Sequence, residues 1–277
     1  MSLATARSLL FAPGNDEHRL EKALAAGADA VVADLEDAVP DAEKEAARTV
    51  ARGVLAGAQT GSLVAVRINA VGTDHWESDL HAFAGVKLDA IVLPKATPDA
   101  VAALGPKGPP IVAIVETATG VRQAYETALE PRVTALILGA VDLGLELGLE
   151  PRADGQEVLY ARSALVVDSA AAGIRGPFDL VHLDTQDDEG LEEESLLARS
   201  LGFRGKVCIH PAQVEIVNRV FSPTREDGDR ARRVVEAYER GVADGRGAVA
   251  LDGEMIDLPV VERARRILAE TERSASE

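Results

Sequence analysis

Ionisable side chains stand at the ends of nearly all the apolar runs in this chain, and their types decide what chemistry it could do. The runs close on Asp34, Glu36 and Asp37, on Arg67 and Asn69, and then on Lys95, Glu116, Asp142, Asp184 and His210. Three like charges after one buried run repel one another and are costly to remove from water. We therefore expect the acids at 34, 36 and 37 to face cations from other run ends, as the wall of a cation site.

Glu116 and Asp142 close two successive runs, PIVAIVET and TALILGAVD. Two carboxylates with no thiol and no pair of histidines suit a hard cation that keeps several waters, so Mg²⁺ is favoured over Zn²⁺. The pair is predicted to bind this ion. The alternative for each residue alone is a role at a helix N-terminus, in ETATG for Glu116 and in VDLGLELG for Asp142.

Arg67 and Lys95 are the cations of the predicted site. Arg67 ends the apolar run of VAVRIN, and its planar guanidinium can bind a substrate carboxylate through two hydrogen bonds. Lys95, in LPKA, is expected to contact the substrate as well. Its alternative role is an ion pair with an acid of the same site.

Eight short apolar runs, each followed by a stretch with helical spacing, would position these side chains. The runs are 8–13, 29–36, 63–69, 89–95, 110–117, 134–142, 178–184 and 205–211. Eight such units predict an α/β fold of the (β/α)8 TIM-barrel type, with its active site at the carboxyl ends of the strands. The alternative is a doubly wound sheet, but that fold usually has fewer strands, and no G-x-G-x-x-G follows the first run.

The predicted barrel spans residues 1–222. Residues 223–277 are predicted to form a C-terminal extension of helices and a lid-like tail, either within the same domain or as an appendage.

The amino-acid composition shows which classes of protein this chain can belong to. The 277 residues are 47% hydrophobic but only 3% aromatic, which is typical of parallel strands covered by Ala-rich helices. The formal charge of −17 excludes an overall basic surface for nucleic acid. No apolar run approaches the roughly 18 residues of a membrane span, and we expect a cytoplasmic protein without a membrane partner. The single cysteine, Cys208, is expected to be a small buried side chain.

Seven segments, in order along nearly the whole chain, carry a family resemblance. They are RSLLFAPGNDEHRLEKALAAGADAVVADLEDAV, VRINAVGTDHWESDL, IVLPKA, IVETATGV, GAVDLGLELG, KVCIHPAQVEIVNRVFSP and LDGEMIDLP. Together they resemble the citrate lyase β-subunit group of the HpcH/HpaI aldolase and malyl-CoA lyase superfamily. The resemblance implies a Mg²⁺-dependent lyase that cleaves a citryl, citramalyl or malyl thioester into an acetyl thioester and oxaloacetate, pyruvate or glyoxylate.

The resemblance also implies roles for individual residues. Glu116 and Asp142 correspond to the magnesium ligands, and Arg67 to the residue that holds the keto-acid carboxylate. Glu36 and Asp37 would surround these groups. Asp34 is then expected nearer the barrel interior, paired with Lys95.

Further roles fall outside the strand ends. Asp257, in the M-I-D-x-P segment, matches an acid/base that reaches into a neighbouring subunit's site, which implies a homo-oligomer, a trimer or hexamer. Arg19 and Lys22 fall where relatives hold the phosphates of CoA, and their alternative is an ordinary solvated helix face. The thioester would be carried on CoA or on an acyl-carrier protein, and any other citrate lyase subunits would be separate chains.

Two other functions stay open at this point. One is a 4-hydroxy-2-oxoacid aldolase of the same barrel, although that group generally lacks the M-I-D-x-P segment. The other is a non-catalytic subunit or sensor of a citrate lyase complex. The chain also departs from many relatives at Val141, where they have an acid before the second magnesium ligand.

Overall fold

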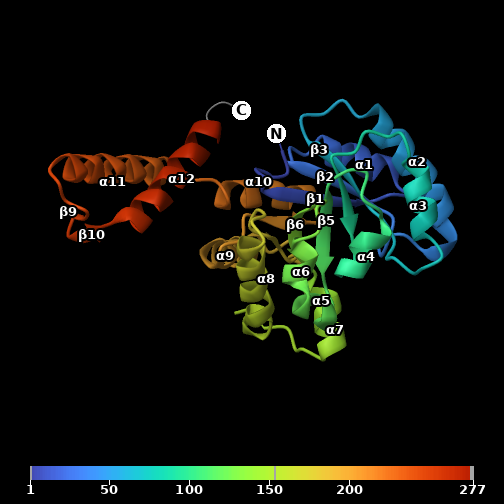
Figure 1. Cartoon of the computed structure of the whole chain (residues 1–277). Helices are drawn as coiled ribbons and strands as arrows, with labels where there is room; N and C mark the ends of the chain where they lie inside the picture. Colours follow the sequence, from blue (N-terminus) through green and yellow to red (C-terminus); the bar gives the residue numbers. More distant parts are fainter. Residues whose placement is uncertain (1, 153, 275–277) are drawn as a thin grey trace. The chain divides into compact units, whose positions relative to one another are not determined.

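Eight parallel strands close into a barrel in the computed structural model, which describes residues 2–152 and 154–274 (Figure 1). The strands are β1 (Ser8–Pro13), β2 (Ala30–Asp34), β3 (Leu63–Arg67), β4 (Ala90–Leu93), β5 (Ile111–Val115), β6 (Val133–Leu138), β7 (Phe178–Asp179) and β8 (Gly205–Cys208). Each strand pairs with its neighbours in chain order, and β1 also pairs with β8. The predicted (β/α)8 TIM barrel is confirmed.

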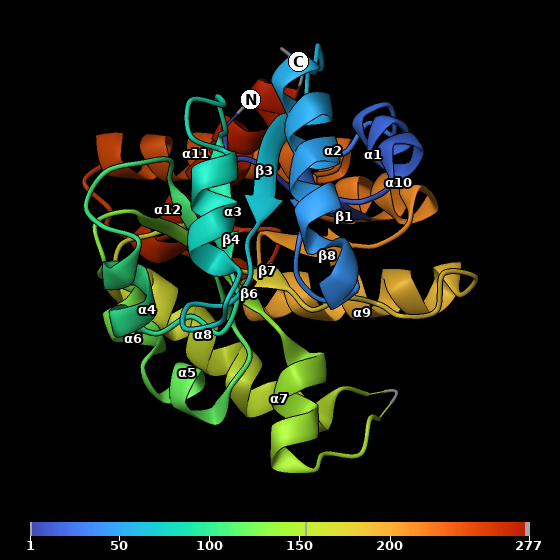
Figure 2. The same cartoon turned by 90° about the vertical axis from the view of Figure 1, so that its right-hand side faces the viewer.

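Helices lie outside the strands and connect them. They are α1 (Glu17–Leu24), α2 (Lys44–Gly57), α3 (Trp76–Ala82), α4 (Pro98–Ala103), α5 (Ala118–Arg122), α6 (Ala124–Ala128), α7 (Ala140–Leu147), α8 (Leu159–Ala171), α9 (Asp188–Leu201) and α10 (Pro211–Val220), with short 3₁₀ turns η1 (Asp41–Glu43) and η2 (Gln156–Val158). In Figure 2 the arrow of β3 points toward the end of the barrel where α5 and α7 lie. This carboxyl end is where the candidate site is built.

The two-residue period of the strands divides the core in two. In β2, Val32 belongs to a cluster inside the barrel, whereas Val31 belongs to the larger cluster between strands and helices. Many residues of the inner cluster are small, including Ala30, Ala65 and Ala90. This alternation predicts whether the side chains just beyond each strand point into the barrel or outward, because every second side chain lies on the same face.

The strands end earlier than the apolar runs predicted. The sixth run was expected to extend as a strand to Asp142, but β6 ends at Leu138 and the chain turns at Gly139 into α7. Asp142 therefore lies in the first turn of a helix, where the helix dipole stabilises a carboxylate. It is not the N-cap, because that position belongs to Gly139. Helix and strand both tolerate the Leu- and Val-rich segment, so the apolar pattern alone did not mark this boundary.

The chain divides into two compact units, Met1–Phe221 and Ser222–Glu277. The second unit contains α11 (Arg225–Ala243), the antiparallel hairpin of β9 (Val249–Leu251) and β10 (Glu254–Ile256), and α12 (Leu258–Ser274). It has a hydrophobic cluster of its own, which includes Val234, Ile256 and Val261. Among the described residues, no helix combines the length and the apolar character needed to cross a bilayer.

Candidate active site

An ion pair between Asp34 and Arg67 lies at the carboxyl ends of β2 and β3. The two residues are register partners on these neighbouring strands, and both follow the inward-facing period. Arg67 donates from Nε to Asp34 Oδ1 at 2.7 Å and from Nη2 to Asp34 Oδ2 at 2.5 Å. The ring centroid of Phe11 lies 5.4 Å from the guanidinium carbon. Two parallel hydrogen bonds fix the plane of the guanidinium, so its remaining nitrogen has a defined direction.

Glu36 and Asp37 face that remaining nitrogen, Nη1 of Arg67. It lies 3.0 Å from Glu36 Oε2 and 3.4 Å from Asp37 Oδ2. Burial lowers the pKa of Arg67, but the hydrogen bond with Asp34 and the charges of all three acids outweigh burial and raise it. Asp34 and Glu36 are buried, whereas 59% of the Asp37 side chain is exposed. The acids predicted to form one wall are therefore brought together, and Arg67 is their common counter-charge.

The expected pairing of Asp34 with Lys95 is wrong. Lys95 Nζ lies 3.7 Å from Glu36 Oε1, and its side chain is 48% exposed. The strand register explains the difference, since it places Arg67 directly beside Asp34. The alternative role that the sequence left open for Lys95, an ion pair with an acid of the site, is the one observed.

The backbone of Lys95 has a separate effect on the site. Lys95 adopts a left-handed conformation with φ of 48°, which is uncommon for a residue with a side chain. Its N–H donates to Glu116 Oε1 at 2.7 Å. The left-handed backbone at Lys95 therefore holds one oxygen of the buried Glu116 carboxylate. The other oxygen of that carboxylate is left to different partners.

Glu116 lies one residue beyond β5, where its carboxylate meets the end of β6. Gly139 follows β6 at the corresponding register position, as Ile114 pairs with Ile137 and Val115 with Leu138. A Cβ at position 139 would lie 2.4 Å from Glu116 Cβ and 2.7 Å from Glu116 Oε2. Only glycine leaves this space, so the turn after β6 is shaped around the carboxylate.

Glu116 and Asp142 form a donor set that fits a magnesium ion. Burial and the charge of Asp142 raise the pKa of Glu116 to about 7. The hydrogen bond from the Lys95 N–H lowers this pKa but does not outweigh them. A divalent cation would relieve this repulsion and favour the ionised carboxylate. Among the described residues, no cluster of three or more His, Cys, Asp or Glu side chains could hold a metal. Water and substrate oxygens would therefore complete the coordination, which is usual for Mg²⁺.

Glu36 adds a second sign of a missing polar neighbour. Burial raises its pKa to about 8; Arg67 lowers the value, and Asp37 and Glu116 raise it. Its Oε2 atom is buried and makes no hydrogen bond, although Nη1 of Arg67 is 3.0 Å away. Buried carboxylate oxygens without partners are rare in folded proteins. Glu36 does not line the cavity itself, and it is connected to the site through its ion pair with Arg67.

Several of these groups line a cavity of about 460 Å³ at the carboxyl end of the barrel, but Glu36 and Lys95 are not among its lining residues. Its polar lining residues are Arg19, Asp34, Asp37, Arg67, Glu116 and Asp142. The rest of the lining is apolar or glycine and includes Phe11, Ile114, Ile137, Val181, Val207 and Ile209. Asp184 and His210, which also close predicted runs, are not lining residues, and His210 instead caps α10.

A neighbouring pocket of about 610 Å³ opens beside α1 and shares Pro13, Arg19 and Ala38 with the cavity. Arg19 lies between the two spaces, is 68% exposed and pairs with Asp16 at 3.1 Å. Lys22 lies in the last turn of α1 and is exposed. Both basic residues thus lie on the helix beside the pocket, although acids also line it.

Asp257 belongs to the second unit. It precedes α12, and its Oδ1 accepts a hydrogen bond from Val260 N at 3.4 Å, as the side chain of an N-cap residue does. The residue is partly exposed. Its acid/base role stays a prediction.

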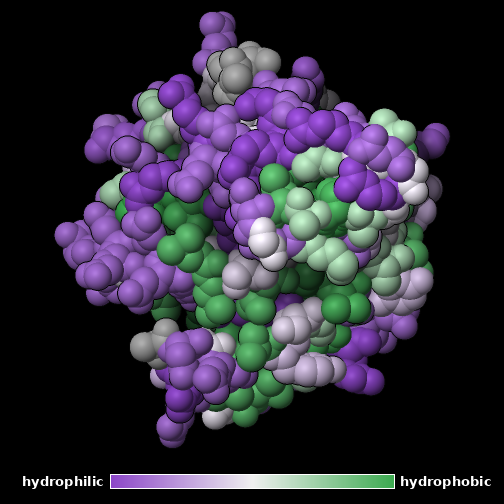
Figure 3. All heavy atoms as spheres, turned by 90° about the vertical axis from the view of Figure 1, so that its left-hand side faces the viewer, coloured by the Kyte–Doolittle hydropathy of each residue, from purple (hydrophilic) through white to green (hydrophobic). Residues whose placement is uncertain are grey.

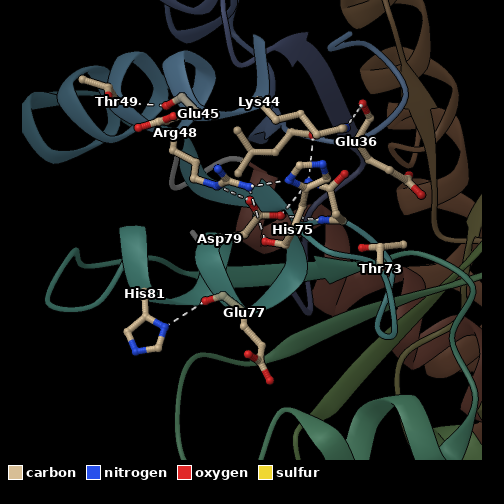
Figure 4. A network of polar contacts seen from close by, with 12 residues as sticks. Glu36, Lys44, Glu45, Arg48, Thr49, Thr73, His75, Glu77, Asp79 and His81 are labelled. Atoms are coloured by element: carbon tan, nitrogen blue, oxygen red, sulfur yellow. Dashed lines mark hydrogen bonds and ion pairs between the residues drawn. The ribbon is translucent and has the colours of Figure 1, made fainter. Parts of the chain in front are cut away.

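A network of polar contacts supports the acidic turn from outside the barrel (Figure 4). Lys44 Nζ donates to the carbonyl oxygens of Leu35 and Glu36 at 2.9 and 3.0 Å. Asn69 Nδ2 donates to the same Leu35 oxygen and to Asp79 Oδ2. On the inner side of the turn, Asp34 accepts from the Glu36 and Ala38 N–H groups. The backbone of Glu36 is therefore held from both sides.

Asp79 is the centre of this network, and it is fully buried. Its Oδ2 accepts from both Asn69 N and Asn69 Nδ2, and its Oδ1 accepts from Arg48 Nε, all at 2.7 Å. Sequence reasoning missed Asp79, Lys44 and Gly139. Asp79 is one of two acids in the amphipathic segment HWESDL, and nothing in the sequence distinguishes it from Glu77. Gly139 could have been found, because a glycine directly follows the strand next to the one that ends at Glu116.

We expect Asp79→Asn to lower the free energy of unfolding by roughly 3 kcal/mol. An amide cannot accept from Arg48 and Asn69 together without placing its own NH₂ against a donor. Urea unfolding measures the change. Asp74→Asn, at an exposed position five residues away, is the control and should change stability by less than about 0.5 kcal/mol. Equal stability of the two variants would contradict the role of Asp79 as the centre of the network.

We expect Gly139→Ala to weaken Mg²⁺ binding about 10- to 100-fold, because the new methyl group displaces Glu116. Isothermal calorimetry with Mg²⁺ measures the affinity. Gly144→Ala, inside the helix that Gly139 precedes, is the matched control, since a Cβ there meets only Leu149 Cβ at 4.0 Å. The control should bind Mg²⁺ normally and gain stability from helix propensity. Unchanged affinity in Gly139→Ala would show that Glu116 does not bind the ion.

Two family descriptions match this chain. Residues 7–211 match the HpcH/HpaI aldolase/citrate lyase family, and residues 160–272 match the C–C bond lyases of the TIM-barrel fold.

Individual relatives match over almost the full length. A (3S)-malyl-CoA thioesterase of Cereibacter sphaeroides is 39% identical over 275 residues, which cover 98% of this chain and 96% of the relative. The citrate lyase subunit beta of Leuconostoc mesenteroides subsp. cremoris is 36% identical over 278 residues, which cover 95% of this chain and 92% of the relative. The crystal structure of protein CitE from Mycobacterium tuberculosis, in complex with magnesium, acetoacetate and coenzyme A, is 38% identical with a TM-score of 0.86 and covers 98% of this chain and 100% of that chain.

Proposed function

Because the chain belongs to the HpcH/HpaI aldolase/citrate lyase family, we propose that it is a Mg²⁺-dependent lyase of hydroxyacyl thioesters. The reaction breaks the bond between the hydroxyl-bearing carbon and the methylene group next to the thioester. The products are a keto acid and an acetyl thioester. The observation that carries this proposal is the cavity whose lining brings together Glu116, Asp142 and Arg67.

Charge development in this reaction matches the side chains of the cavity. The hydroxyl loses a proton, the carbon–carbon bond breaks, and its electron pair moves onto the methylene carbon and the thioester oxygen. Magnesium held by Glu116 and Asp142 would acidify the hydroxyl and bind the adjacent carboxylate. Arg67, fixed in plane by Asp34, would neutralise the substrate carboxylate. Lys95 adds a second positive charge beside Glu36.

The methylene carbon must finally take up a proton, and Asp257 is proposed to deliver it in the site of a neighbouring copy of the chain. Exposed apolar residues next to Asp257 support an assembly of copies, since Met255 is 70% exposed and Leu258 53%. Figure 3 shows apolar side chains at the surface among the hydrophilic ones. A trimer or hexamer would bury such residues, and sedimentation of the purified chain tests this assembly.

Coenzyme A is the carrier that we propose for the acyl group, because the CitE relative was crystallised with it. Arg19 and Lys22 would contact its phosphates beside the pocket at α1. An acyl-carrier protein would use the same pantetheine arm, so the two carriers are compared directly in the assay below.

The test is an assay of the purified protein with Mg²⁺ and malyl, citramalyl and citryl thioesters, each carried on CoA and on an acyl-carrier protein. We expect release of a keto acid together with acetyl-CoA, and no release when EDTA is added. A free thiol and an intact hydroxy acid would instead indicate hydrolysis, the activity named for the Cereibacter relative. Cleavage of a free 4-hydroxy-2-oxoacid without a thioester would favour an aldolase. Inactivity of the isolated chain with every substrate would favour a non-catalytic subunit.

A further inference from the structure

The side-chain amide of Gln213 connects the two chain segments that follow β7 and β8. This residue lies in the first turn of α10 and is only 2% exposed. Its Oε1 accepts from Ile209 N at 2.9 Å and from His210 N at 3.3 Å. Its Nε2 donates to the carbonyl oxygen of His182 at 2.9 Å. Both halves of the amide are therefore used, one on each segment.

This connection lies just beyond the point where the pairing of the two strands ends. The last paired residues of β7 and β8 are Asp179 and Lys206. In the same register His182 would lie opposite Ile209, and the amide joins the backbones of these two residues. Gln213 thus takes the place of a backbone hydrogen bond between neighbouring strands, and it holds the two segments apart by the width of its amide.

The joined segments form an apolar wall of the cavity. Val181 directly precedes His182, Val207 belongs to β8, and Ile209 follows that strand. All three of these apolar residues line the cavity. Among the described residues, β7, β8 and the segments just after them contribute no charged side chain to the lining. Gln213 itself is not a lining residue, so it can act on the cavity only through this wall.

A buried ion network holds the same segment through the ring of His182. Its Nδ1 lies 3.1 Å from Glu194 Oε2, and Glu194 also pairs with Arg162 and Lys206, which are fully buried. A change at Gln213 would release the backbone of His182 but leave this network in place. We therefore expect the effect of such a change to stay local.

We propose that Gln213 is a positioning residue that sets the apolar wall against the uncharged part of the substrate, an inference that rests on the proposed function. The metal ligands and Arg67 would hold the hydroxyl and the carboxylate, so the methylene carbon and the thioester are left to the uncharged part of the lining. The wall contacts this part of the substrate before and during the reaction. Its displacement therefore weakens substrate binding more than it slows bond breaking.

Gln213→Glu separates the two halves of the amide. The carboxylate still accepts from the N–H groups of Ile209 and His210, so α10 stays capped, but it cannot donate to His182. The substrate is whichever of the malyl, citramalyl and citryl thioesters the wild type cleaves best. At about pH 8 we expect its KM to rise about 10-fold, with kcat within about twofold of wild type. Gln186→Glu, at an exposed position in the segment after β7, is the control and should leave KM unchanged.

Lowering the pH to about 6 should reverse the effect in Gln213→Glu. A buried carboxyl group is costly to ionise, and its protonated form can donate to the His182 oxygen as the amide does. The readout is KM relative to wild type at each pH, because His182, His210 and Glu116 are present in both proteins. We expect this ratio to return to within about twofold of one. A raised ratio that is equal at both pH values would overturn the role of the His182 hydrogen bond.

Hydrogen exchange followed by mass spectrometry gives a readout that needs no turnover. At about pH 8, the amides of residues 180–187 should exchange faster in Gln213→Glu than in the wild type, whereas those of α10 should not. Unchanged exchange in residues 180–187, or an unchanged KM, would overturn the proposal. Equally faster exchange in α10 would show that Gln213 only caps the helix. If the wild type cleaves no thioester, the proposed function fails instead, and the exchange of residues 180–187 still tests the connection.

Discussion

Glu116→Gln is expected to reduce lyase activity by about three orders of magnitude and to abolish Mg²⁺ binding at the site. The amide retains the size of the carboxylate and can still accept the hydrogen bond from Lys95 N. It removes the charge that, with Asp142, would hold the cation. Turnover of a malyl or citramalyl thioester and calorimetry with Mg²⁺ measure the two effects separately.

Glu150→Gln is the matched control, because that residue is an exposed acid just beyond α7. It should bind Mg²⁺ and turn over substrate like the wild type. Full activity of Glu116→Gln would exclude Glu116 as a magnesium ligand. Normal Mg²⁺ affinity with lost activity would instead place Glu116 at the substrate and not at the ion.

The same carboxyl group predicts how magnesium and pH act together on stability. Burial, assisted by Asp142, raises the pKa of Glu116 from 4.5 to about 7 in the folded, metal-free protein. The stability that its proton contributes is fully present below 4.5 and is lost as the pH rises through about 7. Mg²⁺ replaces that proton, so it should raise the melting temperature more at about pH 8 than at about pH 6. In Glu116→Gln this difference should become smaller.

Arg67→Met is expected to lower activity about 100- to 1,000-fold and to reduce the free energy of unfolding by roughly 3–5 kcal/mol. The activity falls because the substrate carboxylate loses its counter-charge. The stability falls for a different reason: Asp34 and Glu36 are buried and would remain without a guanidinium. Steady-state kinetics and urea unfolding measure these effects on the same preparation.

A double variant separates the two effects. In Asp34→Leu/Arg67→Met the buried carboxylate is removed together with its partner, so most of the lost stability should return while activity stays low. Arg67→Lys should retain part of the stability but lack the two parallel hydrogen bonds to Asp34, and its activity should stay at least about tenfold below wild type. Recovery of activity in the double variant would show that Arg67 acts only through stability.

The sequence predicted the barrel well because its signals are local and repeated. Each strand is a short apolar run followed by a helical pattern, and eight such units leave few other folds. The grouping of Asp34, Glu36, Asp37, Arg67, Glu116 and Asp142 followed from one rule, that parallel strands of a barrel end on the same side. The boundary at Gly139 was missed because Leu- and Val-rich segments suit the end of a strand and the start of a helix equally.

Pair assignments within the site could not be predicted in the same way. The choice between Lys95 and Arg67 as the partner of Asp34 depends on strand register, and the apolar pattern does not define the register of one strand against the next. Lys44 binds the backbone carbonyl of Leu35, and Asp79 joins Asn69 to Arg48, which lies 31 residues away in the sequence. Such contacts exist only once α2 and α3 lie against the barrel.

The register of β2 and β3 also protects the chain from a misfolded alternative. If β3 slipped by one residue, Arg67 would turn to the outer face, and Asp34 would remain buried without a counter-charge. A buried unpaired carboxylate is strongly destabilising, so the slipped arrangement would be rejected even though its valines and alanines could pack almost as well. The acidic turn thus selects the native strand alignment during folding, in addition to any part that it has in catalysis.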